Sequence, residues 1–135
     1  MRYFSMNEMT ASSTAVRKGI DNTPDASVKA NLTALVANVL DPLREAYGKP
    51  IFVSSGYRCA KLNRAVGGVA RSQHLSGMAA DIQSVGKSKA EHKKLFELVQ
   101  RLNLPYDQLI DEHDYKWVHV SYNAKGNRRQ ILHVK

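Results

Sequence analysis

Apolar residues recur at helical spacing along the second quarter of the chain, between Pro24 and Gly48. Thr23 offers a side-chain oxygen for an N-cap, and Pro24 suits the first position of a helix. We therefore expect one long helix that begins at Pro24, ends before Gly48 and serves as core scaffold. The apolar positions that follow the helical period are Val28, Leu32, Leu35, Val36, Val39, Leu40 and Leu43.

Three further segments carry helical signals. Ser5 and Glu8 form a capping box, which predicts a first helix over Met6–Lys18. A short helix is expected from Arg58 to Val66, and an amphipathic helix from Lys89 to Leu102. The positions of this last helix that we expect to face inward are Leu95, Phe96, Leu98, Val99 and Leu102.

The second half of the chain alternates these helices with short β-rich segments. The predicted strands are Ile51–Ser54, Met78–Ile82, Gln108–Glu112, Trp117–Tyr122 and Gln130–Val134. Helices come first and strands mostly later, which favours an α+β fold with helices packed on a small central antiparallel sheet. We expect residues 1–135 to form a single domain, because 135 residues fit one compact unit.

Composition narrows the function classes. The chain has 20 Lys and Arg against 12 Asp and Glu, a net charge of +8, which favours polyanionic partners such as nucleic acid, anionic lipid or an acidic wall polymer. The single Cys59 excludes an internal disulfide and a four-cysteine zinc site. No apolar stretch approaches the ~20 residues of a membrane span. The N-terminus has no apolar run suited to a Sec signal peptide, so we expect cytoplasmic synthesis; export by another route or a mature form are the alternatives.

Two histidines and one aspartate occupy unusual positions in the predicted loops and strands. His74 lies in a loop rich in Gly and Ser, whereas Asp81 and His119 lie inside apolar strands. A carboxylate in an apolar strand needs a partner, because an unpaired buried charge is costly. Two His and one Asp can form a catalytic zinc site with one open position. The alternatives are an ion pair of Asp81 with Arg58 or Arg71, and a core role for His119.

The sequence resembles the M15 family of zinc peptidases, which includes D-Ala-D-Ala carboxypeptidases and related peptidoglycan peptidases. The resemblance covers about Phe4 to His133 and is most specific in the Ser-x-His-x-x-Gly-x-Ala-x-Asp pattern with a downstream Trp-Val-His. It implies a hedgehog-like, D,D-peptidase-like fold. The matching segments are Ser54–Arg58, Leu62–Asn63, Val66–Gly68, Ser72–Ile82 and Trp117–Tyr122.

The resemblance also implies roles for individual residues. His74, Asp81 and His119 match the family's zinc ligands. Arg58 matches the arginine that binds the terminal carboxylate of the substrate, a task that suits its bidentate guanidinium, although an ion pair with a local Asp is the alternative. Ser72 matches a serine near the substrate but could equally cap the loop. Trp117 would form a wall of the site.

The general base is less clearly marked. Many family members carry a Glu three residues before the last zinc histidine, but this position is Lys116 here. Shorter relatives carry a Glu after a Leu-Ile pair on the preceding strand, which matches Glu112. If residues 113–116 form a four-residue hairpin loop, Glu112 pairs with Trp117 and shares the face of His119. In a three-residue loop the Glu112 side chain would point away from His119, and Asp114 would be the alternative general base. A further alternative is that the whole acidic turn is solvated and has no catalytic role.

The resemblance therefore implies a zinc-dependent peptidase that acts on stem peptides of bacterial peptidoglycan, as a D-Ala-D-Ala carboxypeptidase and a monomer. Alternatives are an L-Ala-D-Glu or cross-bridge endopeptidase (an endolysin), and a non-catalytic zinc-containing wall-binding module. Anionic wall polymers are a further candidate partner, and action at the cell wall would follow release at lysis if the gene is viral. Nucleic-acid binding is suggested only by the charge and the basic groups at 87–94 and 125–129. His92 and His133 are expected to be ordinary surface or sheet histidines.

Overall fold

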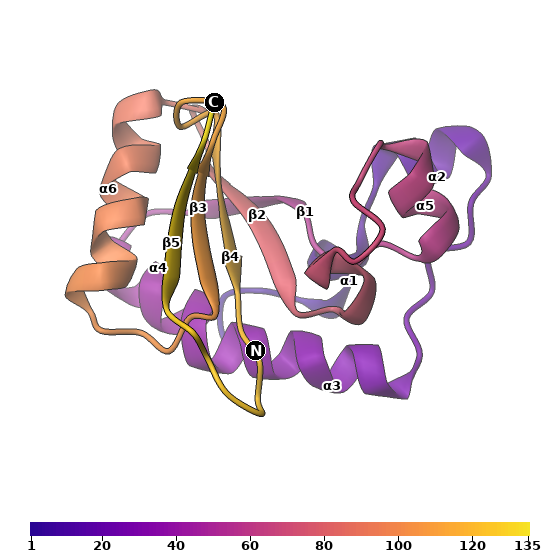
Figure 1. The fold of residues 1–135 in the computed structure, drawn as a ribbon, viewed down its shortest axis with the longest axis horizontal. Helices are drawn as coiled ribbons and strands as arrows, with labels where there is room; N and C mark the ends of the chain where they lie inside the picture. Colours follow the sequence, from indigo (N-terminus) through magenta and orange to yellow (C-terminus); the bar gives the residue numbers. More distant parts are fainter.

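A computed structural model describes the chain from Met1 to Lys135. One five-stranded sheet runs through the molecule in the order β1-β2-β4-β3-β5 (Figure 1). The strands are β1 (Ile51–Ser55), β2 (Ala79–Ser84), β3 (Gln108–Glu112), β4 (Trp117–Ser121) and β5 (Gln130–Val134). The helices are α1 (Met6–Thr10), α2 (Ser13–Lys18), α3 (Ala26–Leu35), the π-helix η1 (Val36–Leu40), α4 (Asp41–Tyr47), α5 (Ala60–Ala65), the 3₁₀ turn η2 (Gln73–Ser76) and α6 (Lys89–Arg101).

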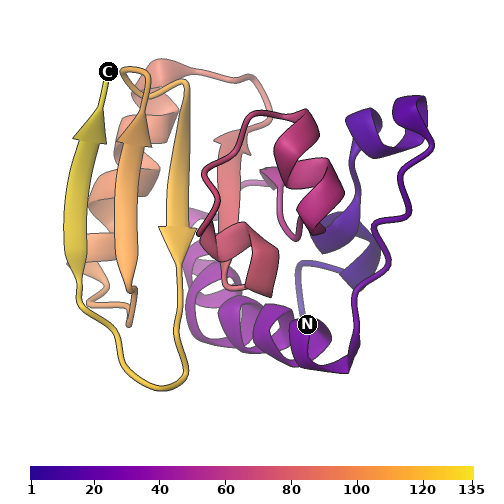
Figure 2. The ribbon, with the colours of Figure 1, turned by 45° about the vertical axis from the view of Figure 1, so that its right-hand side comes forward.

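The sheet confirms the predicted α+β class with one exception in strand direction. Four strands pair antiparallel, as expected, but β5 pairs with β3 in parallel. Figure 2 shows that the connection after β4 stays at the end of the sheet where β4 finishes and leads past β3 to the edge. The strand β5 therefore runs opposite to β4 and parallel to β3. The sheet is thus mostly antiparallel, with a parallel strand at one edge.

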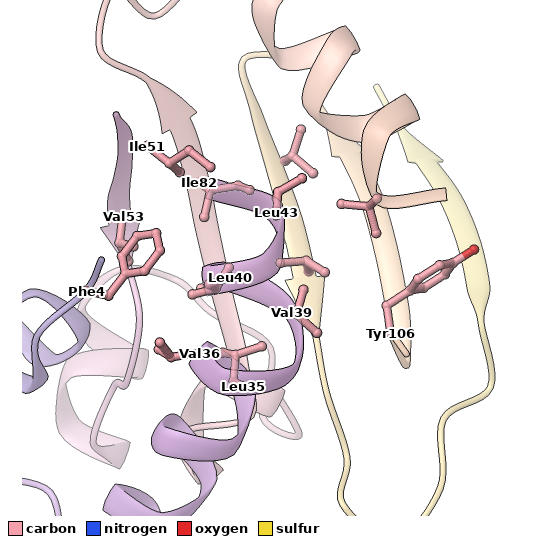
Figure 3. Packing of buried hydrophobic residues seen from close by; sticks show 14 of the residues in the cluster. Phe4, Leu35, Val36, Val39, Leu40, Leu43, Ile51, Val53, Ile82 and Tyr106 are labelled. Atoms are coloured by element: carbon pink, nitrogen blue, oxygen red, sulfur yellow. The ribbon is translucent and has the colours of Figure 1, made fainter. Parts of the chain in front are cut away.

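The two faces of the sheet differ in what covers them. Figure 2 shows α6 behind the sheet and the segment with α5 and η2 in front of it. The rear face contributes Ala80, Ile82, Val118 and Val120 to a hydrophobic cluster of 21 buried residues. Figure 3 shows how the long helix and the sheet both supply side chains to this cluster. Because side chains alternate along a strand, the neighbours of these residues face the opposite side.

The first predicted helix is in fact two. Ala11 is extended, and Ser12 begins α2 by accepting a hydrogen bond from the Ala15 N–H at 3.1 Å. Ser5 caps α1 by accepting the Glu8 N–H at 3.1 Å, but a second capping serine follows within the same segment. The prediction of one helix over residues 6–18 is therefore wrong in its middle, where Ser12 competes for the backbone.

The long helix is continuous, but its start and its centre differ from the prediction. Asp25, rather than Thr23, caps it by accepting the Val28 N–H at 2.9 Å. The turn before Asp41 is a π-helix, and the next residue, Pro42, has no N–H for an ordinary helical bond. The helix ends before Gly48 as predicted, and Gly48 caps it in the left-handed conformation. No helix of the chain has both the length and the apolar character of a membrane span.

Two side chains of α6 depart from the expected pattern. Leu102, predicted to face inward, is 37% exposed just after the helix ends. His92, expected to be an ordinary surface or sheet histidine, is completely buried. Its Nδ1 lies 2.7 Å from the carbonyl oxygen of Tyr115, so this ring anchors the loop between β3 and β4 from behind the sheet.

Candidate metal centre and cleft

The register of the sheet brings Asp81 and His119 side by side on its front face. Asp81 of β2 pairs directly with His119 of β4, and His119 pairs on its other side with Ile110 of β3. His74 reaches the same point from η2, which lies over the beginning of β2. The strand pattern therefore places two of the predicted ligands, and a separate turn supplies the third.

The three side chains converge closely enough to hold a metal ion. The Asp81 Oδ1 atom lies 3.0 Å from His119 Nδ1 and 3.3 Å from His74 Nε2. One ligand atom from each residue lies within 4.8 Å of the others. The rings of His74 and His119 meet edge to face with their centroids 5.1 Å apart. This His/Asp/His donor set leaves room for further ligands, as catalytic metal sites do.

The hydrogen bonds of His74 favour a ligand role for its Nε2 atom. Its Nδ1 lies 2.6 Å from the carbonyl oxygen of Gly56 and must donate to it, because a carbonyl only accepts. In the neutral ring, Nε2 then carries the lone pair, and this atom is buried without a hydrogen-bond partner. An unpartnered buried acceptor beside a carboxylate and a second imidazole fits a divalent cation.

Asp81 is held in the charged form that a metal requires. Burial by itself would raise the pKa of its carboxyl group, but the hydrogen bond from His119 outweighs burial and holds that pKa below its ordinary value. No salt bridge joins Asp81 to Arg58 or Arg71. The alternative that Asp81 is the structural ion-pair partner of an arginine is therefore wrong.

The candidate metal site lies in a cleft of about 740 Å³ on the front of the sheet. The remaining residues that the sequence predicted for the site also line this cleft, namely Arg58, Ser72, Glu112 and Trp117. The acidic side chains that line it are Asp81 and Glu112. The predicted site residues are thus brought together in one place, although they come from β2, β3, β4, η2 with its cap, and the segment after β1.

Glu112 takes the orientation expected for a four-residue hairpin loop. It pairs with Trp117, and the Lys116 N–H donates to the Glu112 carbonyl oxygen at 3.0 Å. The side chain of Glu112 therefore lies on the face of His119 and lines the cleft. Asp114, the fallback base, does not line the cleft. It is 71% exposed and forms an ion pair with Lys89 at the start of α6, behind the sheet.

Arg58 has the surroundings of an anion-binding residue. No salt bridge engages its guanidinium, and its Nε is buried without a hydrogen-bond partner. Burial lowers the pKa of Arg58, while the charges of Asp81 and Glu112 act in the opposite direction. The expected alternative, an ion pair with a local Asp, is absent.

Ser72 and Trp117 have local roles beside their place in the cleft. Ser72 caps η2 by accepting the His74 N–H at 3.2 Å, so the capping alternative holds and the serine also fixes the turn that carries His74. Trp117 packs against His113 with ring centroids 5.1 Å apart, at the end of the cleft where Glu112 lies.

One cluster that borders the cleft was not anticipated from the sequence. Asp107, which precedes β3, is 3% exposed and accepts hydrogen bonds from Gln73 and from Arg128. Gln73 stands directly before His74, and Arg128 belongs to the basic group at 125–129. In the sequence, the basic group at 125–129 indicated only an excess of positive charge. Asp107 follows a Leu-Pro-Tyr turn and belongs to no motif, so the sequence offered no reason to pair Asp107 with Arg128.

Comparison with known proteins agrees with the site. A family model described as Peptidase M15 matches residues 2–121. A search of curated proteins finds no match. The match spans most of the chain and includes all three residues that could hold a metal. This chain therefore belongs to the peptidase M15 family of metal-dependent peptidases.

Proposed function

We propose that the protein is a zinc peptidase that removes the terminal D-Ala from stem peptides of bacterial peptidoglycan. The observation that supports it best is the cleft, in which a His/Asp/His set, a carboxylate and an unpaired arginine face the same space. A peptide carboxylate is the natural partner for Arg58, because guanidinium groups bind carboxylates through two parallel hydrogen bonds. The net charge of +8 suits work on an anionic wall.

The residues of the chain divide the hydrolysis between them. When bound to His74, Asp81 and His119, zinc would lower the pKa of water and polarise the scissile carbonyl. The Glu112 carboxylate accepts a proton from the attacking water and passes it to the leaving amine as the C–N bond breaks. Arg58 holds the terminal carboxylate so that the scissile bond lies between it and Glu112. Trp117 walls the Glu112 end of the cleft.

The test is digestion of a synthetic stem pentapeptide and of purified peptidoglycan with zinc-loaded protein, followed by mass spectrometry of the new termini. We expect loss of one terminal D-Ala. The His74→Ala variant should lose both bound zinc and activity, whereas Glu112→Gln should keep zinc and lose turnover. His133→Ala is the matched control, because His133 is a mostly exposed histidine outside the cleft.

The outcomes separate the candidates. Cleavage between L-Ala and D-Glu, or within a cross-bridge, would replace the carboxypeptidase assignment by an endopeptidase. Stoichiometric zinc without any cleavage would favour a wall-binding module, which the lysine at position 116 would then explain. Full hydrolysis by His74→Ala would contradict the metal-based mechanism altogether.

A further inference from the structure

The family match ends at Ser121, but a residue beyond Ser121 also lines the cleft. The segment that joins β4 to β5 supplies Arg128 to the lining of the cleft. Arg128 is thus a cationic wall residue that the matched part of the chain does not contain. Its role has to be inferred from its own surroundings.

The guanidinium of Arg128 is fixed on one edge and free on the other. The Asp107 carboxylate accepts hydrogen bonds from Arg128 Nε at 3.0 Å and from Nη2 at 2.9 Å. It also accepts the Arg128 backbone N–H at 2.9 Å and Gln73 Nε2 at 2.8 Å. Asp107 is buried, whereas the Arg128 side chain is 60% exposed and its Nη1 bonds to no group of the chain. Its orientation is therefore set before any ligand arrives.

The sheet places Arg128 and Arg58 on opposite sides of the metal residues. Arg58 follows β1, at one edge of the sheet, while Arg128 precedes β5, at the other edge. Gln108 and Arg128 both line the cleft. Gln108 lies on the strand next to that of His119, two residues before Ile110, which pairs with His119. At ~3.3 Å per residue and ~4.8 Å per strand this is roughly 8 Å, the span of two to three extended residues.

We propose that Arg128 is a specificity-determining residue that binds a second acidic group of the substrate, on the amino-terminal side of the scissile bond. This inference rests on the proposed function, in which Arg58 takes the terminal carboxylate. The preferred substrate would then be a peptide with a free carboxylate two or three residues before the bond that is cut. Arg71 adds a further positive charge to the same cleft.

The test compares two pentapeptides that differ in one group. One is L-Ala-γ-D-Glu-L-Lys-D-Ala-D-Ala, with a free carboxylate on its second residue, and the other has this carboxylate amidated. Their affinities are measured by calorimetry in the zinc-loaded Glu112→Gln background, so that no peptide is consumed. Their kcat and KM values are measured in the chain with Glu112 intact.

We expect amidation to weaken binding about tenfold when Arg128 is present, as for the loss of one charged hydrogen bond. Arg128→Gln should remove this preference and raise KM for the acidic peptide with little change in kcat, and Arg128→Lys should restore part of it. Arg129→Gln is the matched control. It removes the same charge one position away, but Arg129 bonds to Asn103 and does not line the cleft.

Each outcome decides one of the two proposals. Equal affinity for the two peptides, or failure of both to bind, would overturn the role of Arg128. The same holds if Arg128→Gln lowers the unfolding midpoint but keeps the preference, because Arg128 would then only anchor the chain. Absence of D-Ala release by the zinc-loaded protein would overturn the proposed reaction, and the affinity difference would still report on Arg128.

Discussion

Asp107 joins three segments of the chain through one carboxylate. It receives Gln73 from η2, Arg128 from the segment before β5, and its own backbone continues into β3. The hydrogen bond from the Arg128 side chain, helped by the Arg128 backbone N–H and by Gln73, lowers the pKa of Asp107 to about 2, although burial opposes the shift. A buried carboxylate with this set of donors is a stabilising contact as well as a clamp for the cleft.

We expect Asp107→Asn to lower the free energy of unfolding by about 2 kcal/mol at pH 7, the usual contribution of a buried hydrogen bond to a charged group. The pKa of folded Asp107 lies below its value near 4 in the unfolded chain, so this stabilisation is complete above pH 4 and is lost as the pH falls through 2. Urea titrations from pH 7 down to pH 2 should show the gap between variant and parent closing.

The control is Asp114→Asn, which changes an exposed carboxylate paired with Lys89. Exposed ion pairs contribute roughly 0–1 kcal/mol, so this variant should unfold close to the parent. A gap for Asp107→Asn that stayed constant over the whole pH range would show that the charge of Asp107 is not what stabilises the fold.

Residue identity singled out the three candidate metal ligands, and the resemblance to the M15 family assigned their roles. His74, Asp81 and His119 were marked by a loop histidine and by polar residues inside apolar strands, and the sheet register brings them together. Asp107 and His92 were not recognised. Each depends on a partner far along the chain, Arg128 and the Tyr115 carbonyl, which no local pattern can supply.

Among the elements, the hairpin between β3 and β4 carries the most strain. His113, Asp114 and Tyr115 all have positive φ angles, of 51°, 57° and 63°, where residues other than glycine are disfavoured. The loop is held by contacts from outside it. The His92 ring bonds to the Tyr115 carbonyl oxygen, and the His113 N–H donates to the carbonyl of Val134 in β5. These contacts keep Glu112 and Trp117 in register at one end of the cleft.

We expect His92→Leu to lower the free energy of unfolding by roughly 1–3 kcal/mol, because leucine fills the space but leaves the Tyr115 carbonyl and Ser84 Oγ without the imidazole. Hydrogen exchange at the Lys116 amide, which closes the loop onto Glu112, should become faster.

Lys89→Gln serves as the comparison for this variant. It touches the same loop through Asp114, but from an exposed position on α6, and should change stability by less than about 1 kcal/mol. Unchanged exchange at Lys116 in His92→Leu would show that the hairpin keeps its shape without the buried ring.

For the helices and strands, the sequence predicted which elements exist more accurately than the residues at which they begin and end. The periodic apolar positions identified the long helix and α6, because packing of one face determines such helices. Ser12 split the first helix and Asp25 displaced Thr23 as a cap, since several residues in each turn could cap and only tertiary contacts choose among them. The π-helix before Pro42 could not be read from periodicity, which it changes by one residue.

For the molecule as a whole, the candidate metal centre links two layers. Asp81 and His119 belong to the sheet, whereas His74 belongs to the turn that covers it. Because an ion bound by all three residues binds only the folded chain, its affinity adds directly to stability. The sheet and its covering segment should therefore unfold together when the ion is present.

We expect zinc at about 1,000 times its dissociation constant to stabilise the chain by roughly 4 kcal/mol and to raise Tm by roughly 10 °C or more over chelated protein. Thermal unfolding followed by circular dichroism, with and without chelator, measures this shift. His119→Ala should show almost none of it, while His133→Ala should keep it. A full shift in His119→Ala would place the bound ion elsewhere on the chain.

The α+β class and the antiparallel core of the sheet followed from the order of helices and strands. The parallel pairing of β5 did not, because the connection of residues 122–129 is compatible with either edge and either direction. The path of this connection matters for the site, because it places Arg128 in the lining of the cleft.

The partner of His74 is a main-chain oxygen, that of Gly56, and this glycine is itself pressed against α1. A methyl group at position 56 would come within 2.1 Å of the Met9 carbonyl oxygen. No exchange of a neighbouring side chain can therefore delete the acceptor that selects the protonated nitrogen of the ring. Only movement of the backbone can do so. We therefore expect the packing of the first helix to influence metal affinity, which directed evolution could tune there without altering any ligand.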